Sequence, residues 1–357
     1  MQRILSLATL AAIGGLGWLF LQGGGLDRIA VKARNNGQSS AQNNSGHYQT
    51  PGPWMGSPNG PGGQSSQYLP ASSGVAANDP HSGPASGPTI RIASYNIQVF
   101  GGKKASKPYV MNALAEIVQK FDVVAIQEIR SKDEYLIPNF VQLINRSGRR
   151  YDHIIGPRLG YTTVKEQYAY LYDTERIEVD RQSIFTVGDP DGLLHREPLV
   201  ATFRTRGVDP ANAFTFTLIN IHTDPDEVPE ELDALAEVYR VVRRAGRDED
   251  DIILLGDLNT DDRHLGRLGQ LPGIYPLVAG VWTNTRQDKQ YDNLLIHQPS
   301  TVEYAGRSGV FDIMRLMNLN ERQALEVSDH FPVWAEFSVY ERDLHGRIAN
   351  RRLMQNR

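Results

Sequence analysis

Residues 214–259 read FTFTLINIHTDPDEVPEELDALAEVYRVVRRAGRDEDDIILLGDLN, and the order of the elements expected here indicates the class of fold. It begins with an apolar run, Phe214–Ile221, which is dense in Phe and Ile as strands buried on at least one face are. Its middle, Pro229–Arg244, places apolar side chains on one stripe of a helix, and the proline stands where a first helical turn tolerates it. A second apolar run, Ile252–Leu255, follows. A strand, a helix and a strand in succession predict a domain that contains both helices and sheets.

Short runs rich in Val, Ile, Phe and Tyr recur on both sides of this stretch. They are Ile90–Ile97, Val123–Ile129, Ala169–Tyr172, Leu199–Phe203, Asn293–Ile296 and Val333–Val339, and each has the composition of a strand. A second amphipathic helix is expected at Lys107–Lys120. There is no internal repeat, so we predict one globular domain over residues 89–340, a length that a single core can fill.

The N-terminal part of the chain has a different composition. Ile4–Gln22 carries no charge and is long enough to span a bilayer, so we interpret residues 1–25 as a membrane anchor or, alternatively, a cleaved signal peptide. Residues 26–88 are interpreted as a disordered linker, because Gly, Ser, Pro, Asn and Gln dominate from Asn35 onward. Both interpretations place the domain outside the cytoplasm, either anchored to the membrane or secreted or periplasmic.

Composition excludes several classes of function. The chain contains no cysteine, which excludes disulfides, zinc–thiolate sites and thiol nucleophiles. The formal net charge of −4 argues against a protein that coats nucleic acid through bulk positive charge, although an enzyme can still contact a phosphate backbone. The basic tail, residues 341–357, is interpreted as a frayed, solvated terminus, with contact to phosphate as the alternative.

Polar residues recur where the expected strands begin or end. They are Asn96, Glu128, His222, Asp257, Asn259, Asp292, Asp329 and His330. A single Asn or Asp at a strand end is usually a turn former, and a single His beside an apolar run is often structural. The recurrence of the pattern in several strands favours a shared site.

The residue types in this set fit metal-assisted hydrolysis of a phosphodiester. A hard cation such as Mg²⁺ takes oxygen ligands, and the candidates are Glu128, Asp257, Asp329, Asn96 and Asn259. His222 and His330 are suitable as acid and base because imidazole titrates near neutral pH. A histidine in that role needs a carboxylate to fix its orientation, and Glu166 and Asp292 are the candidates. The sequence does not assign which histidine is the base.

Eight motifs in this order resemble those of the endonuclease/exonuclease/phosphatase superfamily. They are YNIQVF, QEIR, LGYTTVKEQY, HREP, IHTDP with the helix after it, GDLNTD, YDN and SDHFPV. The resemblance covers nearly all of Ile90–Phe337. GDLN and SDHFPV are shared across the superfamily. KEQY, HREP and the IHTDP arrangement resemble more narrowly the deoxyribonuclease I branch.

The resemblance implies a fold of the α+β class, a deoxyribonuclease I-like four-layer α/β sandwich in which two packed mixed β-sheets are flanked by helices. It implies that Glu128 is the main metal ligand and is helped by Asn96, and that Asp257, Asn259 and Asp329 bind metal or the scissile phosphate. It pairs His222 with Glu166 and His330 with Asp292 as catalytic residues, and it implies that Arg130 and Arg196 bind substrate. For an arginine on a loop, a solvated charge is the alternative.

The chain also departs from that branch. Tyr161 and Val164 stand where the family has an arginine and a tyrosine near the DNA minor groove, so some groove contact is absent. A shorter loop, VGDPDGLLH, replaces the family's disulfide loop. Asp189 and Asp191 in this loop are candidate Ca²⁺ ligands, and a plain Asp-Pro-Asp-Gly turn is the alternative.

We therefore predict hydrolysis of DNA phosphodiester bonds that depends on Mg²⁺ or Mn²⁺, with Ca²⁺ as a further candidate ion. DNA is the expected substrate, the membrane is the expected partner of the N-terminal segment, and no obligate protein partner is evident. The first alternative is a phosphodiesterase or phosphatase on a lipid headgroup or a small phosphoester. The second is a catalytically silent binding domain on the same fold.

Overall fold

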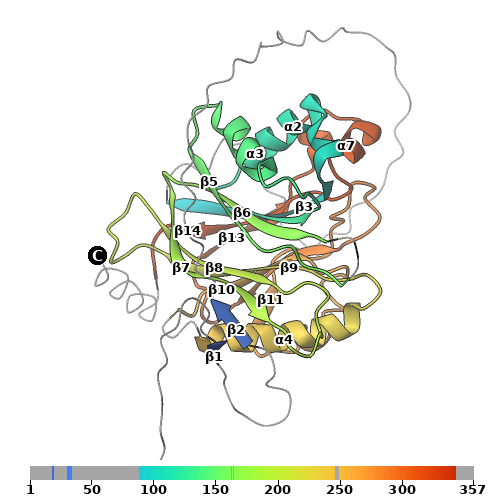
Figure 1. The fold of residues 1–357 in the computed structure, drawn as a ribbon. Coiled ribbons are helices and arrows are strands. Elements are labelled where there is room, and N and C mark those ends of the chain that lie inside the picture. Colours follow the sequence, from blue (N-terminus) through green and yellow to red (C-terminus); the bar gives the residue numbers. More distant parts are fainter. Residues whose placement is uncertain are drawn as a thin grey trace, which may run out of the picture. The chain divides into compact units, whose positions relative to one another are not determined.

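The structure is a computed structural model, and it describes residues 18–19, 30–33, 88–161, 163, 165–245 and 249–342. Two β-sheets pack face to face, and helices cover the outer face of each sheet (Figure 1). This is the four-layer sandwich that the sequence predicts, so the predicted fold class is confirmed.

The first sheet has eight strands and is mixed. Across the sheet they are β1 (Trp18–Leu19), β2 (Ala30–Ala33), β7 (Ile177–Gly188), β8 (Leu199–Thr205), β9 (Thr215–His222), β10 (Ile252–Asp257), β12 (Asp292–His297) and β11 (Ile274–Pro276). Only β9 and β10 run parallel, and the helix between them provides the crossover that a parallel pair requires. Residues 214–259 therefore form the centre of this sheet and the helix that connects its parallel strands.

The second sheet has six strands and is also mixed. Across the sheet they are β13 (Tyr304–Val310), β14 (Val333–Ser338), β3 (Thr89–Phe100), β4 (Val123–Ile129), β6 (Gln167–Asp173) and β5 (Tyr151–Ile155). β3 and β4 form its parallel pair. Each sheet thus has one parallel pair whose carboxyl ends lie side by side.

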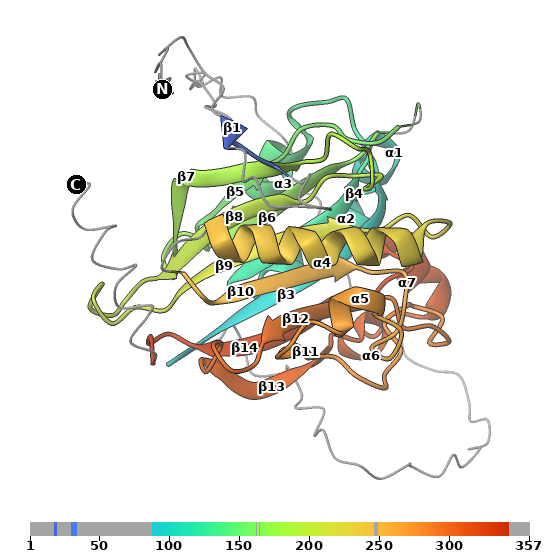
Figure 2. The ribbon, with the colours of Figure 1, turned by 90° about the horizontal axis from the view of Figure 1, so that it is seen from below.

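Seven helices are found in the described part of the chain. They are α1 (Gly102–Ala105), α2 (Pro108–Val118), α3 (Leu136–Asn145), α4 (Val228–Ala245), α5 (Gly266–Gly269), α6 (Ile313–Leu316) and α7 (Glu321–Val327). α2, α3 and α7 lie outside the second sheet, whereas α4 lies along the outer face of the first sheet (Figures 1 and 2). The two helices expected from periodicity, α2 and α4, are confirmed to within two residues at each end.

Hydrophobic side chains separate the layers. Aromatic rings from both sheets meet in the middle layer, where Tyr170, Phe203 and Phe216 pack at centroid distances of 5.4 and 5.6 Å. Buried residues of α2 and α3 pack on the second sheet, and those of α4 pack on the first. Each large apolar side chain buried in this way contributes about 1.5–3 kcal/mol to the free energy of folding. The sandwich is therefore a rigid scaffold for residues at the strand ends.

The terminal segments lie mostly outside the described residues. β1 falls within the predicted anchor and β2 within the predicted linker, and β2 pairs antiparallel with β7. A search of the described residues finds no helix that is long and apolar enough to cross a membrane. Of the basic tail, the structure describes Glu341 and Arg342. The boundaries of anchor, linker, domain and tail stay predictions.

Candidate active site

The predicted site residues of the first sheet lie in one row. In the strand register, Asp257 at the end of β10 is opposite His222 at the end of β9 and opposite Asp292 at the start of β12. Side chains of directly paired residues lie on the same face of a sheet. The three side chains that the sequence places 35 residues or more apart are thereby neighbours, and Asp257 is the central one.

Gly256 allows the strands to come together next to this row. Its φ of +154° is a backbone conformation that L residues rarely adopt. A Cβ at this position would lie 1.9 Å from the carbonyl oxygen of Ile221. The glycine of the GDLN motif is therefore required by the close approach of β9 and β10, which positions Asp257 beside His222.

Asn96 and Glu128 approach the row from the second sheet. The Asn96 side-chain amide donates to Glu128 Oε1 at 3.2 Å and to Asp257 Oδ2 at 2.9 Å, and so connects the two sheets. Glu128 has a φ of +60° at an irregularity where β4 ends. Such a conformation costs of order 1 kcal/mol in a residue with a side chain. It is offset in part by the Val99 backbone amide, which donates to Glu128 Oε2 at 2.8 Å.

His222 and Glu166 form the first carboxylate–histidine pair. His222 Nδ1 lies 2.9 Å from Glu166 Oε2, and His222 Nε2 lies 3.7 Å from Asp257 Oδ2. Burial opposes ionisation of Glu166, but the hydrogen bond and charge of His222 and the charges of Arg196 and Arg130 outweigh it and lower the pKa of Glu166 to about 2. Glu166 is therefore an ionised partner that holds the imidazole with its Nε2 toward Asp257.

His330 and Asp292 form the second pair. His330 Nδ1 lies 2.8 Å from Asp292 Oδ2, and His330 Nε2 lies 3.6 Å from Asp257 Oδ2. Burial opposes the charged form of His330, yet the negative charges of Asp292 and Asp257 raise its pKa. The Thr283 hydroxyl donates to Asp292 Oδ2 at 2.8 Å and fixes the carboxylate from behind. The two histidines therefore face one carboxylate oxygen from two sides.

The two predicted arginines occupy different positions. Arg130 is about a third exposed, and its guanidinium contacts Glu128 Oε2 at 3.2 Å and Glu166 Oε1 at 2.8 Å. Arg196 is buried and donates to the carbonyl oxygens of His222 and Thr223, each at 3.1 Å. Arg130 is thus accessible at the site, whereas Arg196 holds the backbone beside His222. Contact of either arginine with substrate stays a prediction.

Asn259 and Asp329 lie at the edge of the same group. The Asn259 side chain donates to the carbonyl oxygen of Thr223 at 2.9 Å, and its backbone amide donates to Asp257 Oδ1 at 2.9 Å. The Gln98 side chain donates to Asp329 Oδ2 at 2.7 Å. All eight of the strand-end residues predicted from the sequence are therefore brought together.

The residues of this group fit a divalent cation. Asn96 Oδ1 and Asp329 Oδ1 are buried without a hydrogen-bond partner, and the surrounding ligand atoms are the oxygens that Mg²⁺ prefers. Asp257, Asp292 and His330 offer atoms within 4.8 Å of one another, but the last two bind each other directly. We therefore keep Glu128, Asn96, Asp257 and Asp329 as the predicted ligands.

Three residues of the site were not found from the sequence. Thr283 and Gln98 each fix a carboxylate of the group, and Lys104 on α1 lies near it. Burial lowers the pKa of Lys104 to about 8, although the charges of Asp329 and Glu128 oppose that change. Gln98 lies in the YNIQVF motif, so the sequence could have indicated it as a site residue. Thr283 lies in none of the quoted motifs, and nothing in the sequence around it indicates a role.

The structure describes most of the residues at which the chain departs from the deoxyribonuclease I branch. Tyr161 is exposed, and its hydroxyl donates to the carbonyl oxygen of Leu194 at 2.7 Å. Val164 lies outside the described residues. Asp189 Oδ2 accepts from the Leu194 backbone amide at 2.6 Å, a contact that is typical of a plain turn. A calcium ion at Asp189 and Asp191 stays a prediction.

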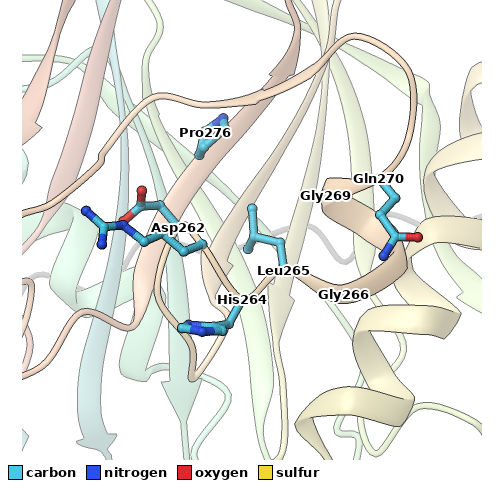
Figure 3. Close-up of a pocket in the computed structure, with 8 residues that line it drawn as sticks. Asp262, His264, Leu265, Gly266, Gly269, Gln270 and Pro276 are labelled. Atoms are coloured by element: carbon cyan, nitrogen blue, oxygen red, sulfur yellow. The ribbon is translucent and has the colours of Figure 1, made fainter.

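A separate pocket lies next to α5 and β11 and contains none of the predicted site residues (Figure 3). It has a volume of about 480 Å³ and is lined by residues that include Asp262, His264, Leu265 and Gln270. His264 Nδ1 there is 2.7 Å from the carboxylate of Asp261, and both side chains are largely open to solvent. The pocket lacks the converging carboxylates of the strand-end site.

Comparison with known proteins finds similar sequences over most of the domain. Residues 93–330 match the sequence profile of the Endonuclease/Exonuclease/phosphatase family. Deoxyribonuclease gamma of Rattus norvegicus is 31% identical over 263 residues, which cover 69% of this chain and 83% of that protein. Deoxyribonuclease-1-like 1 of Sus scrofa is 33% identical over 262 residues, covering 70% and 81%.

A solved structure of humanized TDP2 from D. rerio, which carries 14 mutations, has a similar fold. Its TM-score is 0.50 at 16% identity, and the match covers 70% of this chain and 99% of that chain. At this level of identity the likeness concerns the fold alone, and it agrees with the two packed mixed sheets described above.

Proposed function

The chain belongs to the endonuclease/exonuclease/phosphatase family, and we propose that it hydrolyses the phosphodiester bonds of DNA by a two-histidine mechanism that depends on a divalent metal. The family and the relatives directly support its assignment as a hydrolase acting on phosphodiester bonds. The substrate, the metal and the roles of the residues are what we propose beyond that assignment.

One observation carries the mechanism: Nε2 of both histidines lies within 3.7 Å of Asp257 Oδ2. Hydrolysis forms a bond between phosphorus and a water oxygen and breaks the bond between phosphorus and the leaving deoxyribose oxygen. One imidazole accepts the proton of the water, and the other donates a proton to the leaving oxygen. Glu166 and Asp292 hold the two rings through Nδ1, so that each Nε2 is the atom that exchanges the proton.

Glu128, Asn96, Asp257 and Asp329 are the residues that would hold the metal. When bound, a divalent cation supplies charge stabilisation for the phosphoryl oxygens. Arg130, which is partly exposed beside Glu128, adds a positive charge that can contact a phosphate. Asn259, held by Thr223, presents an amide at the same edge. These residues would orient the scissile phosphate between the two histidines.

DNA is proposed as the substrate because the relatives at 31% and 33% identity are named as deoxyribonucleases and the motifs KEQY and HREP are present. The alternative substrate is a lipid phosphodiester, and the apolar segment Ile4–Gln22 is the observation that favours it. The same segment supports the proposal that the enzyme is anchored to a membrane and faces away from the cytoplasm, or is exported.

A plasmid assay with the full chain tests the proposed function. Supercoiled plasmid and a lipid phosphodiester are offered separately with Mg²⁺, with and without chelator. We expect the plasmid to be nicked, and we expect chelator and Glu128→Ala to abolish nicking. Glu116→Ala, on the exposed face of α2, serves as the matched control and retains the wild-type rate. An intact plasmid together with turnover of the lipid would overturn the choice of DNA.

A further inference from the structure

Four carboxylates are buried together at the end of the sandwich away from the candidate active site. Glu249 and Asp251 precede β10, Glu303 precedes β13, and Glu341 follows β14. Glu303 and Asp251 have no exposed surface, and ligand atoms of Asp251, Glu303 and Glu341 lie within 4.8 Å of one another. β10 is six residues long, so this acidic cluster lies about 20 Å from Asp257 at its other end.

The cluster contains oxygen atoms that have no partner. Neither carboxylate oxygen of Asp251 accepts a hydrogen bond, and one oxygen each of Glu249, Glu303 and Glu341 is likewise buried without a partner. The Thr215 hydroxyl is a further buried oxygen without a partner, and the Thr215 backbone amide donates to Glu341 Oε2 at 3.3 Å. Buried polar groups are hydrogen-bonded in nearly all proteins, so six such oxygens in one place point to a ligand.

The charge of Arg342 favours ionisation of Glu303, but in the part of the chain that the structure describes the acidic cluster has no ion pair with a positive side chain. Within residues 88–161, 163, 165–245 and 249–342, no Lys, Arg or His forms an ion pair with any of the four carboxylates. Buried charges are otherwise paired with opposite charges or coordinate metals.

We propose that the acidic cluster of Glu249, Asp251, Glu303 and Glu341 binds a Ca²⁺ ion, with the Thr215 hydroxyl as a further ligand. Ca²⁺ takes six to eight oxygen ligands at about 2.4 Å, and two ligands on opposite sides of the ion are then about 4.8 Å apart. Ligand atoms of Asp251, Glu303 and Glu341 lie within such a space, and the acidic cluster as a whole has five unpartnered carboxylate oxygens together with the Thr215 hydroxyl. Mg²⁺ retains several waters, so a dry site made only of protein oxygens favours Ca²⁺.

The ion would connect the two sheets. Thr215, Glu249 and Asp251 come from the first sheet, whereas Glu303 and Glu341 flank strands of the second. Glu341 is also next to the end of the described domain, so the ion would fix the last strand, β14, onto the start of β10. The site is therefore structural, and its effect appears in the stability of the chain and does not require turnover.

The test measures Ca²⁺ binding and thermal unfolding of the full chain after removal of metals with chelator. We expect Ca²⁺ to raise the unfolding midpoint by several degrees, because an ion that binds only the folded state stabilises it by mass action. Mg²⁺ at the same concentration gives a smaller increase. Equilibrium dialysis finds one more Ca²⁺ per chain in wild type than in Asp251→Asn.

Two kinds of variant distinguish metal binding at the acidic cluster from metal binding at the candidate active site. Asp251→Asn and Glu303→Gln remove one charge without changing shape, so without metal both unfold at or above the wild-type midpoint, yet the Ca²⁺-induced increase is lost. Glu128→Gln alters the catalytic group and retains the increase. An increase in Asp251→Asn and Glu303→Gln equal to that of wild type, or no increase in wild type, would overturn the proposal.

Discussion

Asp257 lies between two imidazoles, and each imidazole is held by a carboxylate from a distant part of the chain. Glu166 precedes His222 by 56 residues, and Asp292 precedes His330 by 38. The sequence predicted these two pairs because a catalytic histidine requires an orienting carboxylate and because the motifs resemble those of a known family. The hydrogen-bond geometry agrees with both pairs.

The Thr283 hydroxyl fixes the carboxylate of Asp292, which in turn holds His330. Thr283→Val removes the hydroxyl that donates to Asp292 Oδ2. Loss of a group that orients a functional histidine through its partner typically lowers activity about 10- to 100-fold. We expect kcat for plasmid nicking to fall by at least about tenfold, with a shifted pH profile and little change in KM. Thr202→Val, which removes a hydrogen bond to Thr217 remote from the site, is the control. Equal rates for the two variants would show that Thr283 does not position Asp292.

Glu166 makes the stability of the folded chain depend on pH, because folding lowers its pKa. Its pKa in the folded chain is about 2, below the ordinary value of 4.5, so its ionised form stabilises the fold. This contribution is fully present above pH 4.5 and is lost as pH falls toward 2. The difference in unfolding free energy between wild type and Glu166→Gln is expected to shrink by about 2 kcal/mol between pH 6 and pH 3, because this range crosses about 1.5 pH units below 4.5. Urea unfolding at pH 6 and pH 3 measures it, and a constant difference would contradict the ion pair.

Gly256 determines whether the strands β9 and β10 can lie side by side at the candidate active site. Gly256→Ala would bring a Cβ to 1.9 Å from the Ile221 carbonyl, so we expect a loss of about 3 kcal/mol or more in unfolding free energy. Gly102→Ala is the matched control, because no atom lies within 4 Å of its Cβ and α1 gains helix propensity. A Gly256→Ala chain as stable as Gly102→Ala would mean that the two strands do not approach in this way.

The elements that the sequence predicted are those with continuous apolar runs or a clear helical stripe. β4 was predicted with both ends correct, and α4 to within one residue. β7 was missed because it is half exposed and reads IEVDRQSIFTVG, with charged residues in its first half. β13 was missed because it reads YAGRSGV and depends on pairing with β14. Tertiary pairing stabilises these elements, and their local composition does not reveal it.

Some contacts of the candidate site also depend on tertiary packing that the local sequence does not reveal. Residue types and strand ends predicted which polar side chains gather at the candidate site. The bridge from Asn96 to Asp257 crosses between sheets, and Gln98 and Thr283 come from loops or strand irregularities whose position depends on the packed structure. Asp251 and the glutamates of the acidic cluster looked like ordinary surface charges in the sequence, because only the packed structure buries them.

At the scale of the whole molecule, the sandwich places different chemistry at its two ends. One end gathers the carboxylates and histidines of the candidate active site, and the other gathers four carboxylates for which we propose a Ca²⁺ ion. Both groups take residues from both sheets. The relative position of the two sheets therefore determines the geometry of the catalytic group, and an ion that joins them at the far end would stabilise that geometry.

We propose that a metal held at Glu128 and two histidines on either side of Asp257 cleave DNA. The most direct measurement is the rate of plasmid nicking in Mg²⁺ by folded wild type, Glu128→Gln, His222→Ala and His330→Ala, with Glu116→Gln as control. We predict that each of the three site variants loses about 100-fold or more and that chelator abolishes the wild-type rate. Nicking by Glu128→Gln or either histidine variant at the wild-type rate, or nicking that persists in chelator, would contradict this mechanism.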